Sequence, residues 1–242
     1  MIEVRNITKT YSGTVKAVDD LSITIEDGEI FGFLGPNGAG KTTTIKMITG
    51  ILRPDSGSIK INGTDITEKP LEAKRKFGFV PDDPNIFLRL KGIEYLNFMA
   101  DMYDVSANDR KQRIESLAER FEMSAALYDQ IQSYSHGMRQ KIVIMGVLIH
   151  NPPVWVLDEP MTGLDPKSSF TLKEMMREHA TGGNTVFFST HVLEVAEKLC
   201  DKLAIINKGK ILFAGKIEEM REHFKNNQSF EKMFLELTEN GK

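Results

Sequence analysis

The spacing of apolar residues along this chain predicts an alternation of strands and helices. In residues 1–28, apolar side chains fall on alternate positions, as at Ile2 and Val4, which predicts an antiparallel β part with one buried face. Later strands are predicted at 29–34, 58–61, 77–80, 154–157, 185–188, 203–206 and 210–213, and several of them are apolar on consecutive positions. Consecutive apolar strands separated by helical segments predict an α/β fold with a mainly parallel sheet covered on both faces.

Helical spacing defines the organisation of the rest of the chain. Helices are predicted at 42–52, 70–76, 136–149, 167–179 and 191–199. Between 84 and 135 the strand signals vanish, and segments 91–104 and 109–123 show helical spacing instead. We expect a single domain over residues 1–242, with 84–135 as an inserted helical subdomain and 216–242 as a C-terminal helical tail.

The tail contains an amphipathic segment. Phe230, Met233, Phe234 and Leu237 follow helical spacing and form one apolar face. Such a face packs on its own domain or on a partner, and we expect packing on its own domain.

The most informative stretch joins the strand at 29–34 to the helix after it. From Gly35 to Thr42 the sequence matches G-x-x-x-x-G-K-[ST]. Glycines allow backbone N–H groups to approach phosphate oxygens, and the helix N-terminus points its positive end at them. Lys41 is placed for the β- and γ-phosphates, and the Thr42 hydroxyl is a ligand suited to Mg²⁺. The stretch predicts a phosphate-binding loop for a nucleoside triphosphate with magnesium; a simple Gly-rich connecting turn is the alternative.

Two carboxylates follow the apolar strand at 154–157. Ligand-binding groups of open α/β sheets lie at the carboxyl ends of strands, where Asp158 and Glu159 fall. Asp158 is expected to hold magnesium, directly or through water, and Glu159 to orient the water that attacks the γ-phosphate. An ordinary strand-ending turn is the alternative. Tyr11, after the first strand, either stacks on a nucleotide base or is a half-buried tyrosine.

Composition narrows the class of protein further. The 242 residues are 40% hydrophobic and 27% charged, with a net charge of −3, which gives no electrostatic reason to expect a nucleic-acid partner. Cys200 is the one cysteine, so no internal disulfide forms and a reducing compartment is expected. The first residues lack the apolar core of a signal peptide, and no apolar run has the length to cross a bilayer. We expect a cytoplasmic protein that needs another chain for any work across a membrane.

The ordered motifs together resemble a known family. Tyr11, the loop from Gly35 to Thr43, Tyr134-Ser135-His136-Gly137-Met138, Leu157-Asp158-Glu159-Pro160, Gly163-Leu164-Asp165-Pro166 and Ser189-Thr190-His191 resemble the nucleotide-binding subunit of an ATP-binding-cassette (ABC) transporter. The resemblance covers nearly the whole chain. It implies a P-loop NTPase core and an ATPase that drives a membrane transporter, in the exporter branch whose membrane-spanning permease is a separate chain.

The resemblance also implies roles for individual residues. Tyr11 would stack on adenine, Asp158 would serve magnesium, Glu159 would be the catalytic carboxylate, and His191 would contact the γ-phosphate and the attacking water. The phosphates would be held by Gly35, Pro36, Asn37, Gly38, Ala39, Gly40, Lys41, Thr42 and Thr43. Ser135 and Gly137 would serve the ATP held by a second ABC ATPase subunit, identical or different, and Asp165 would lie at the same seam. The subunit would work on the cytoplasmic face of the cell membrane.

Two positions depart from the family pattern. His136 replaces the first glycine of the usual Leu-Ser-Gly-Gly-Gln signature and adds bulk near the incoming phosphate. Asp82 stands where the family usually has a glutamine that touches magnesium, so we expect Asp82 to offer a charged oxygen ligand and to alter the coupling of hydrolysis to transport. A soluble ABC ATPase for assembly or repair is the alternative function, and a module that binds ATP without turnover is a third.

Overall fold

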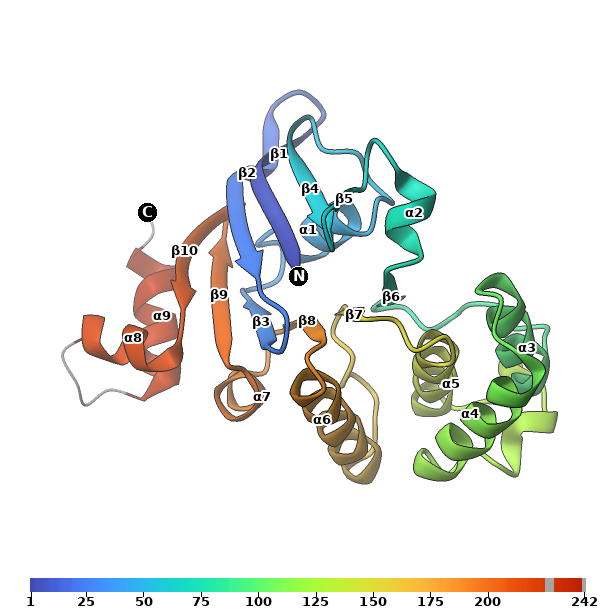
Figure 1. The fold of residues 1–242 in the computed structure, drawn as a ribbon. Helices are drawn as coiled ribbons and strands as arrows, with labels where there is room; N and C mark the ends of the chain where they lie inside the picture. The colour runs from blue at the N-terminus through green and yellow to red at the C-terminus, as the bar shows by residue number, and fades with distance from the viewer. Residues whose placement is uncertain (225–228, 241–242) are drawn as a thin grey trace.

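The parallel sheet lies at the centre of the fold. The structure is a computed structural model that describes residues 1–224 and 229–240 (Figure 1). In this part of the chain one sheet has the strand order β10-β9-β3-β8-β7-β6. Its strands are β3 (Ile30–Leu34), β6 (Phe77–Val80), β7 (Val154–Leu157), β8 (Thr185–Thr190), β9 (Lys202–Asn207) and β10 (Lys210–Gly215). All neighbouring pairs are parallel except β9 and β10, which confirms the mainly parallel sheet.

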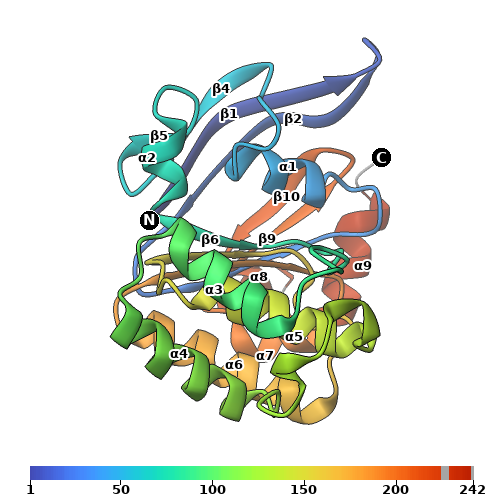
Figure 2. The ribbon, with the colours of Figure 1, turned by 90° about the vertical axis from the view of Figure 1, so that its right-hand side faces the viewer.

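A second, antiparallel sheet contains the N-terminal strands. Its order is β2-β1-β4-β5, with β1 (Ile2–Tyr11), β2 (Val15–Ile25), β4 (Ser56–Ile61) and β5 (Thr64–Asp65). Figure 2 shows this sheet above the parallel sheet, with helix α1 (Lys41–Ile48) between the two. The inner faces of both sheets and α1 share one apolar core, to which Ile7, Phe33 and Ile45 contribute. The antiparallel part expected from residues 1–28 is therefore present, and both of its strands are longer than the apolar alternation indicates.

The other face of the parallel sheet is covered by helices (Figure 1). These are α5 (His136–Leu148), α6 (Pro166–Thr181) and α7 (Leu193–Leu199). Every residue of β3, β7 and β8 is buried, as expected for central strands covered on both sides. Because apolar layers fix these strands, the polar residues just beyond their carboxyl ends are held at defined positions.

Helix α1 is shorter than its sequence pattern indicates. Helical spacing continues to Leu52, yet the helix ends at Ile48 and Gly50 adopts a positive φ of 65°. The backbone N–H groups of Ile51 and Leu52 both donate to the Lys46 carbonyl and close the end of the helix. The apolar residues at 51 and 52 belong to this turn.

Residues 84–135 contain α3 (Gly92–Met102), α4 (Ala107–Arg120) and two short 3₁₀ turns, η1 (Ala126–Tyr128) and η2 (Ile131–Ser133). Strands are absent from this described segment, in line with the sequence pattern. Its apolar side chains join the same core cluster as residues of α5, β7 and α6. The helices of this segment therefore pack directly on the layer that covers the sheet.

The C-terminal segment contains α8 (Ile217–His223) and α9 (Phe230–Asn240). Phe230 and Met233 of α9 are buried in a cluster with Leu34, Leu203 and Ile205. The apolar face of α9 thus packs on its own domain, as expected. A short helix α2 (Pro70–Lys74) completes the fold, and Lys76 after it donates to the Asn62 carbonyl and the Thr64 hydroxyl.

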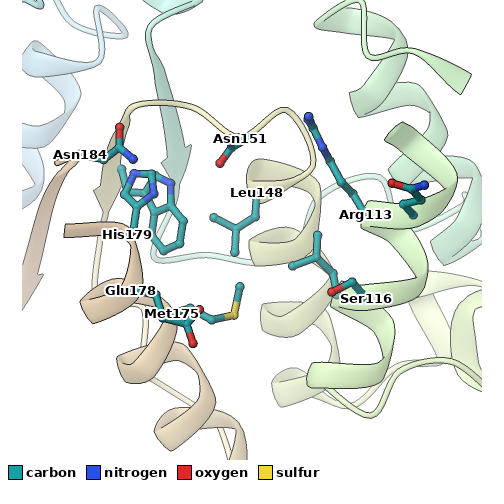
Figure 3. Close-up of a pocket in the computed structure, with 11 residues that line it drawn as sticks. Arg113, Ser116, Leu148, Asn151, Met175, Glu178, His179 and Asn184 are labelled. Atoms are coloured by element: carbon teal, nitrogen blue, oxygen red, sulfur yellow. The ribbon is translucent and has the colours of Figure 1, made fainter. Parts of the chain in front are cut away.

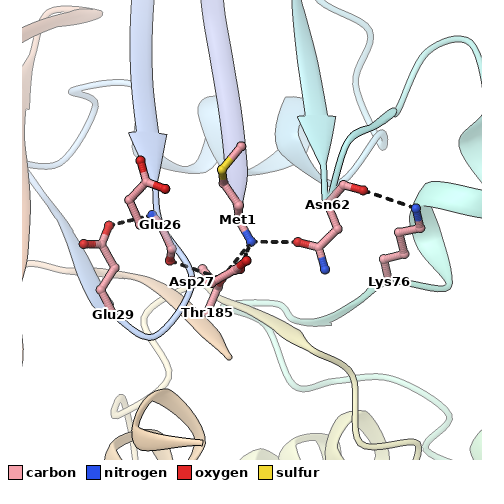
Figure 4. Close-up of polar contacts among 7 residues, drawn as sticks. All are labelled: Met1, Glu26, Asp27, Glu29, Asn62, Lys76 and Thr185. Carbon is pink, nitrogen blue, oxygen red and sulfur yellow. Dashed lines mark hydrogen bonds and ion pairs between the residues drawn. The ribbon is translucent and has the colours of Figure 1, made fainter. Parts of the chain in front are cut away.

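Polar contacts at Met1 join the two sheets (Figure 4). The Met1 nitrogen donates to Asn62 Oδ1 at 2.7 Å, to Thr185 Oγ1 at 3.0 Å, and to the Asp27 carboxylate. Thr185 is the first residue of β8, and its hydroxyl also donates to Asp27 Oδ1 at 2.8 Å. These contacts hold the N-terminal end of β1, in the antiparallel sheet, against the start of β8.

Candidate functional site

The loop from 35 to 40 connects β3 to α1 and has room only for glycine at two places. A Cβ at Gly35 would lie 2.3 Å from the Ile206 carbonyl oxygen, and one at Gly40 would lie 2.4 Å from the Ala17 carbonyl oxygen. Gly40, the N-cap of α1, also has a φ of 111°, in the region that favours glycine. No side chain of the described residues caps α1. Its N–H groups are therefore available to an anion in front of the loop.

A hollow of about 210 Å³ lies in front of this loop. Its lining brings together Ala17, Pro36, Asn37, Gly38, Ala39, Gly40, Lys41, Thr42, Thr43, Asp82 and Glu159. Each residue predicted to hold phosphates contributes to it except Gly35, which lies against β9. The lining has the size and the donors for a polyphosphate group.

Lys41 supplies the buried positive charge of the hollow. The residue is 7% exposed, and its Nζ donates to the Gly35 carbonyl at 2.7 Å and to the Pro36 carbonyl at 3.3 Å. The same Nζ lies 3.8 Å from Glu159 Oε1. Two neutral carbonyls and one distant carboxylate compensate an ammonium only partly, so the site favours an anionic ligand.

The two carboxylates expected at the end of β7 have different surroundings. Asp158 is 2% exposed and accepts a hydrogen bond from Ser189 Oγ at 2.5 Å. Glu159 has a positive φ of 47° and lies on the hollow, where its Oε2 is 2.9 Å from His191 Nδ1. Glu159 therefore lies between Lys41, near its Oε1, and His191, at its Oε2, while Asp158 is more deeply buried.

Burial raises the pKa of the Asp158 carboxyl, and the negative charges of Asp82 and Glu159 raise it further, against hydrogen bonds from Ser189 and Thr42 that lower it. A carboxyl with a raised pKa stabilises the fold while it is protonated. That contribution is complete below the ordinary value of 3.8 and is lost as the pH rises through the raised pKa. At neutral pH the ionised Asp158 therefore destabilises the folded chain.

We expect Asp158→Asn to raise the free energy of unfolding at pH 7 without nucleotide, because it removes a buried negative charge and keeps the shape of the side chain. The gain should shrink as the pH falls through the raised pKa. Thermal unfolding at pH 7 and pH 4 measures it. Asp165→Asn is the opposite-sign control, since the Lys141 ammonium and hydrogen bonds from Ser168 hold the pKa of Asp165 well below its usual range. Lower stability of Asp158→Asn at pH 7 would contradict this account.

The oxygen groups near Asp158 fit magnesium bound with a nucleotide. Among the described residues, no cluster of three or more His, Cys, Asp or Glu side chains could hold a metal ion alone. Mg²⁺ is usually bound by one or two carboxylates together with substrate phosphates and water. Thr42, Asp158 and Asp82 would supply two carboxylates and one hydroxyl of this kind, and the repulsion between the two negative charges favours a bound cation.

Ser135 and Asp165 begin two helices that touch at their N-terminal ends, and neither residue lines the hollow in front of the phosphate loop. Ser135 is exposed and caps α5 by accepting from the Met138 N–H at 3.3 Å. Asp165 caps α6 and pairs with Lys141 of α5 at 2.8 Å. A Cβ at Gly137 would lie 2.5 Å from the Gly163 carbonyl oxygen, so the two segments touch closely. No hydrogen bond within the described residues connects Ser135 to the loop at 35–42 of its own chain.

Tyr11 is another predicted site residue that lies apart from the hollow. It is the last residue of β1, is 43% exposed, and does not line the hollow in front of the phosphate loop. Stacking of Tyr11 on a base stays a prediction.

Ser189 is a site residue whose role the sequence did not reveal. Its hydroxyl donates to the Asp158 carboxylate and accepts the Glu159 backbone N–H at 3.0 Å, so it links the Asp158 side chain and the Glu159 backbone to β8. A polar residue within a fully buried strand beside β7 is the signal that could have indicated it. The ion pair of Lys141 with Asp165 was likewise not predicted.

A phosphate loop follows the central parallel strand β3, and a buried carboxylate and a hydrogen-bonded glutamate follow β7, on the far side of β8. This arrangement defines a P-loop nucleoside triphosphatase. The sequence profile of the ABC transporter family matches residues 18–162. The ABC transporter ATP-binding protein NatA of Bacillus subtilis is 38% identical over 86% of this chain and 85% of its own. EcsA of the same organism, an ABC-type transporter ATP-binding protein, is 34% identical over 98% of this chain and 96% of its own.

A solved structure agrees with these relatives. The structure of an ATP-binding subunit of an ABC transporter superposes with a TM-score of 0.93 at 32% identity, over 98% of this chain and 99% of that one. The chain therefore belongs to the ABC transporter family, as one of its ATP-binding, ATP-hydrolysing subunits. Among the helices that the structure describes, none combines the length and the apolar character needed to cross a lipid bilayer.

Proposed function

We propose that this chain hydrolyses Mg-ATP in the hollow around Lys41 and Glu159 and thereby drives the conformational change of a membrane-spanning permease. The proposal rests on the position of Glu159, which contacts His191 and lies close to Lys41. Lys41 and the α1 N-terminus bind the phosphates, and Glu159 takes the position of the group that orients the attacking water. Magnesium, bound by Thr42 and Asp158 with Asp82 nearby, would neutralise charge on the phosphates.

The exposed Ser135 cap supports closure of two cassettes over ATP. It offers a hydroxyl and a helix N-terminus that none of the described residues of the same chain's phosphate loop uses. The ATP-binding cassette MJ0796, 24% identical over 90% of this chain, is described as a dimer in a post-hydrolysis state with ADP and Pi. In our proposal a second ATPase subunit places its Ser135 and Gly137 against the bound ATP, and His136 lines the seam between the two subunits. When this chain is purified alone, another copy of it serves as the second subunit.

Export is the direction that we propose for the transporter. One relative, 33% identical over 91% of this chain, is the Nod factor export ATP-binding protein I of Cupriavidus metallidurans. The altered signature at His136 agrees with this branch. Substrate selection would belong to the permease, with this subunit on the cytoplasmic face of the membrane.

Purification from membranes tests the transporter role. The chain, tagged at its C-terminus, should co-purify with a chain that carries several membrane spans, and transport into inverted vesicles should require both. Stable ATP hydrolysis with no such partner, and unchanged export after loss of this chain, would instead favour a soluble ATPase for assembly or repair.

A further inference from the structure

A second crevice, which shares no lining residue with the nucleotide site, is shown in Figure 3. It has a volume of about 500 Å³ and lies between α4, the end of α5 and α6. Its floor includes Trp155, in the first half of β7, and Asn184, just before β8. The phosphate loop and Glu159 follow the carboxyl ends of the same sheet, so this crevice is separate from the ATP site.

An aromatic pair forms one wall of the crevice. The rings of Trp155 and His179 are stacked, with centroids 4.1 Å apart and an angle of 18° between the planes. Both residues are more than nine-tenths buried, at 5% and 9% exposure. Trp155 Nε1 and His179 Nε2 have no hydrogen-bond partner among the described residues. Buried polar atoms without a hydrogen-bond partner are uncommon in folded proteins.

Burial lowers the pKa of His179 to about 4, against a hydrogen bond that the ring donates to the Pro153 backbone. The ring is therefore neutral at pH 7. Together with Leu117, Leu148 and Met175, the pair makes the wall suitable for a flat apolar ring.

The opposite wall presents an unpaired cation. Arg113 of α4 is half-buried, and its Nη1 donates to the Ile149 carbonyl at 2.8 Å. No carboxylate within the described ranges forms an ion pair with it, whereas Arg120 on the same helix binds Glu178 through two bonds of 2.9 Å. Glu178 also lines the crevice, and Arg120 already neutralises its charge. Arg113 thus remains as the charge available to a ligand.

We propose that this crevice binds a planar aromatic carboxylate. The ring lies against the apolar side chains and the Trp155–His179 pair, and the carboxylate accepts from the free guanidinium N–H groups of Arg113. The volume falls within the range typical of small-molecule sites. Because the crevice joins α4 to α6, the ligand bridges the helices of 84–135 and the layer that covers the sheet.

The single tryptophan of the chain makes the test specific. In the ¹⁵N-labelled full chain, the one indole N–H signal reports on Trp155. Titration with 2-naphthoate should shift this signal and saturate with a dissociation constant of about 1 mM or tighter. The matched probe 2-naphthamide keeps the ring and lacks the charge, so it should bind about tenfold more weakly. This comparison needs no variant.

Arg113→Gln should weaken 2-naphthoate binding about tenfold. Lys111 is an exposed cation on the same helix, so Lys111→Gln should leave 2-naphthoate binding unchanged. Saturating Mg-ATP should leave the shift in place. Absence of a saturable shift, equal affinity for the acid and the amide, or displacement by ATP would each overturn the proposal; displacement would assign the probe to the nucleotide site.

Discussion

Replacing Glu159 by glutamine should lower the rate of ATP hydrolysis by about 10²–10⁴-fold and leave ATP affinity nearly unchanged, because the change removes a general base. Glutamine keeps the size of the side chain and an oxygen for His191, which lies 2.9 Å from Glu159 Oε2. The amide cannot polarise water as the carboxylate does. It also removes the negative charge that lies 3.8 Å from Lys41, so phosphate binding should not suffer.

Phosphate release under saturating Mg-ATP and equilibrium binding of ATP measure the two quantities separately. Glu194→Gln is the matched control, since Glu194 is an exposed glutamate of α7 that pairs with Lys198 at 2.7 Å and lies outside the hollow. It should hydrolyse ATP at the wild-type rate. Undiminished phosphate release by Glu159→Gln would remove Glu159 from the mechanism.

Replacing Lys41 by methionine should weaken ATP binding by about 10–100-fold, the cost of losing a charge-assisted contact to phosphate. Lys41 is the buried ammonium of the hollow, and its Nζ is held over the loop by the Gly35 and Pro36 carbonyls. Methionine preserves most of the apolar stem and removes the charge, so the loop should keep its packing.

Lys46→Met provides the comparison on the same helix, because Lys46 is exposed in the last turn of α1. Binding of a fluorescent ATP analogue, with thermal unfolding as a check on folding, measures the effect. If Lys41→Met bound ATP like wild type while Lys46→Met weakened it, the phosphates would lie elsewhere.

The fold was largely predictable because buried strands leave a clear apolar pattern in the sequence. Continuous apolar runs such as 154–157 are needed for strands buried on both faces, and these segments are strands in the structure. The end of α1 was not predictable from spacing, because Ile51 and Leu52 are apolar yet belong to a turn closed at Gly50. Strand β8 extends to Thr190, beyond its apolar run, and its polar residue Ser189 donates to the buried Asp158 carboxylate.

The parts of the site that consist of local sequence motifs were predictable. The spacing from Gly35 to Thr42 and the position of Asp158 and Glu159 after β7 indicate the hollow and its two carboxylates. Contacts between distant segments follow from the tertiary fold, so the bonds of the Ser189 hydroxyl to the Asp158 carboxylate and the Glu159 backbone, and the Lys141–Asp165 pair, appeared only in the structure. The crevice beside Trp155 likewise depends on how α4 and α6 pack.

Closure of two cassettes over ATP is the central claim of the proposed function. Light scattering of the Glu159→Gln chain in Mg-ATP measures it most directly, because a slowed hydrolysis step should hold the closed state. The account predicts twice the 27.3 kDa mass of the chain with Mg-ATP and a monomer with Mg-ADP. Wild type should return to monomers as phosphate is released. A variant that binds ATP and stays monomeric would contradict closure between copies of this chain.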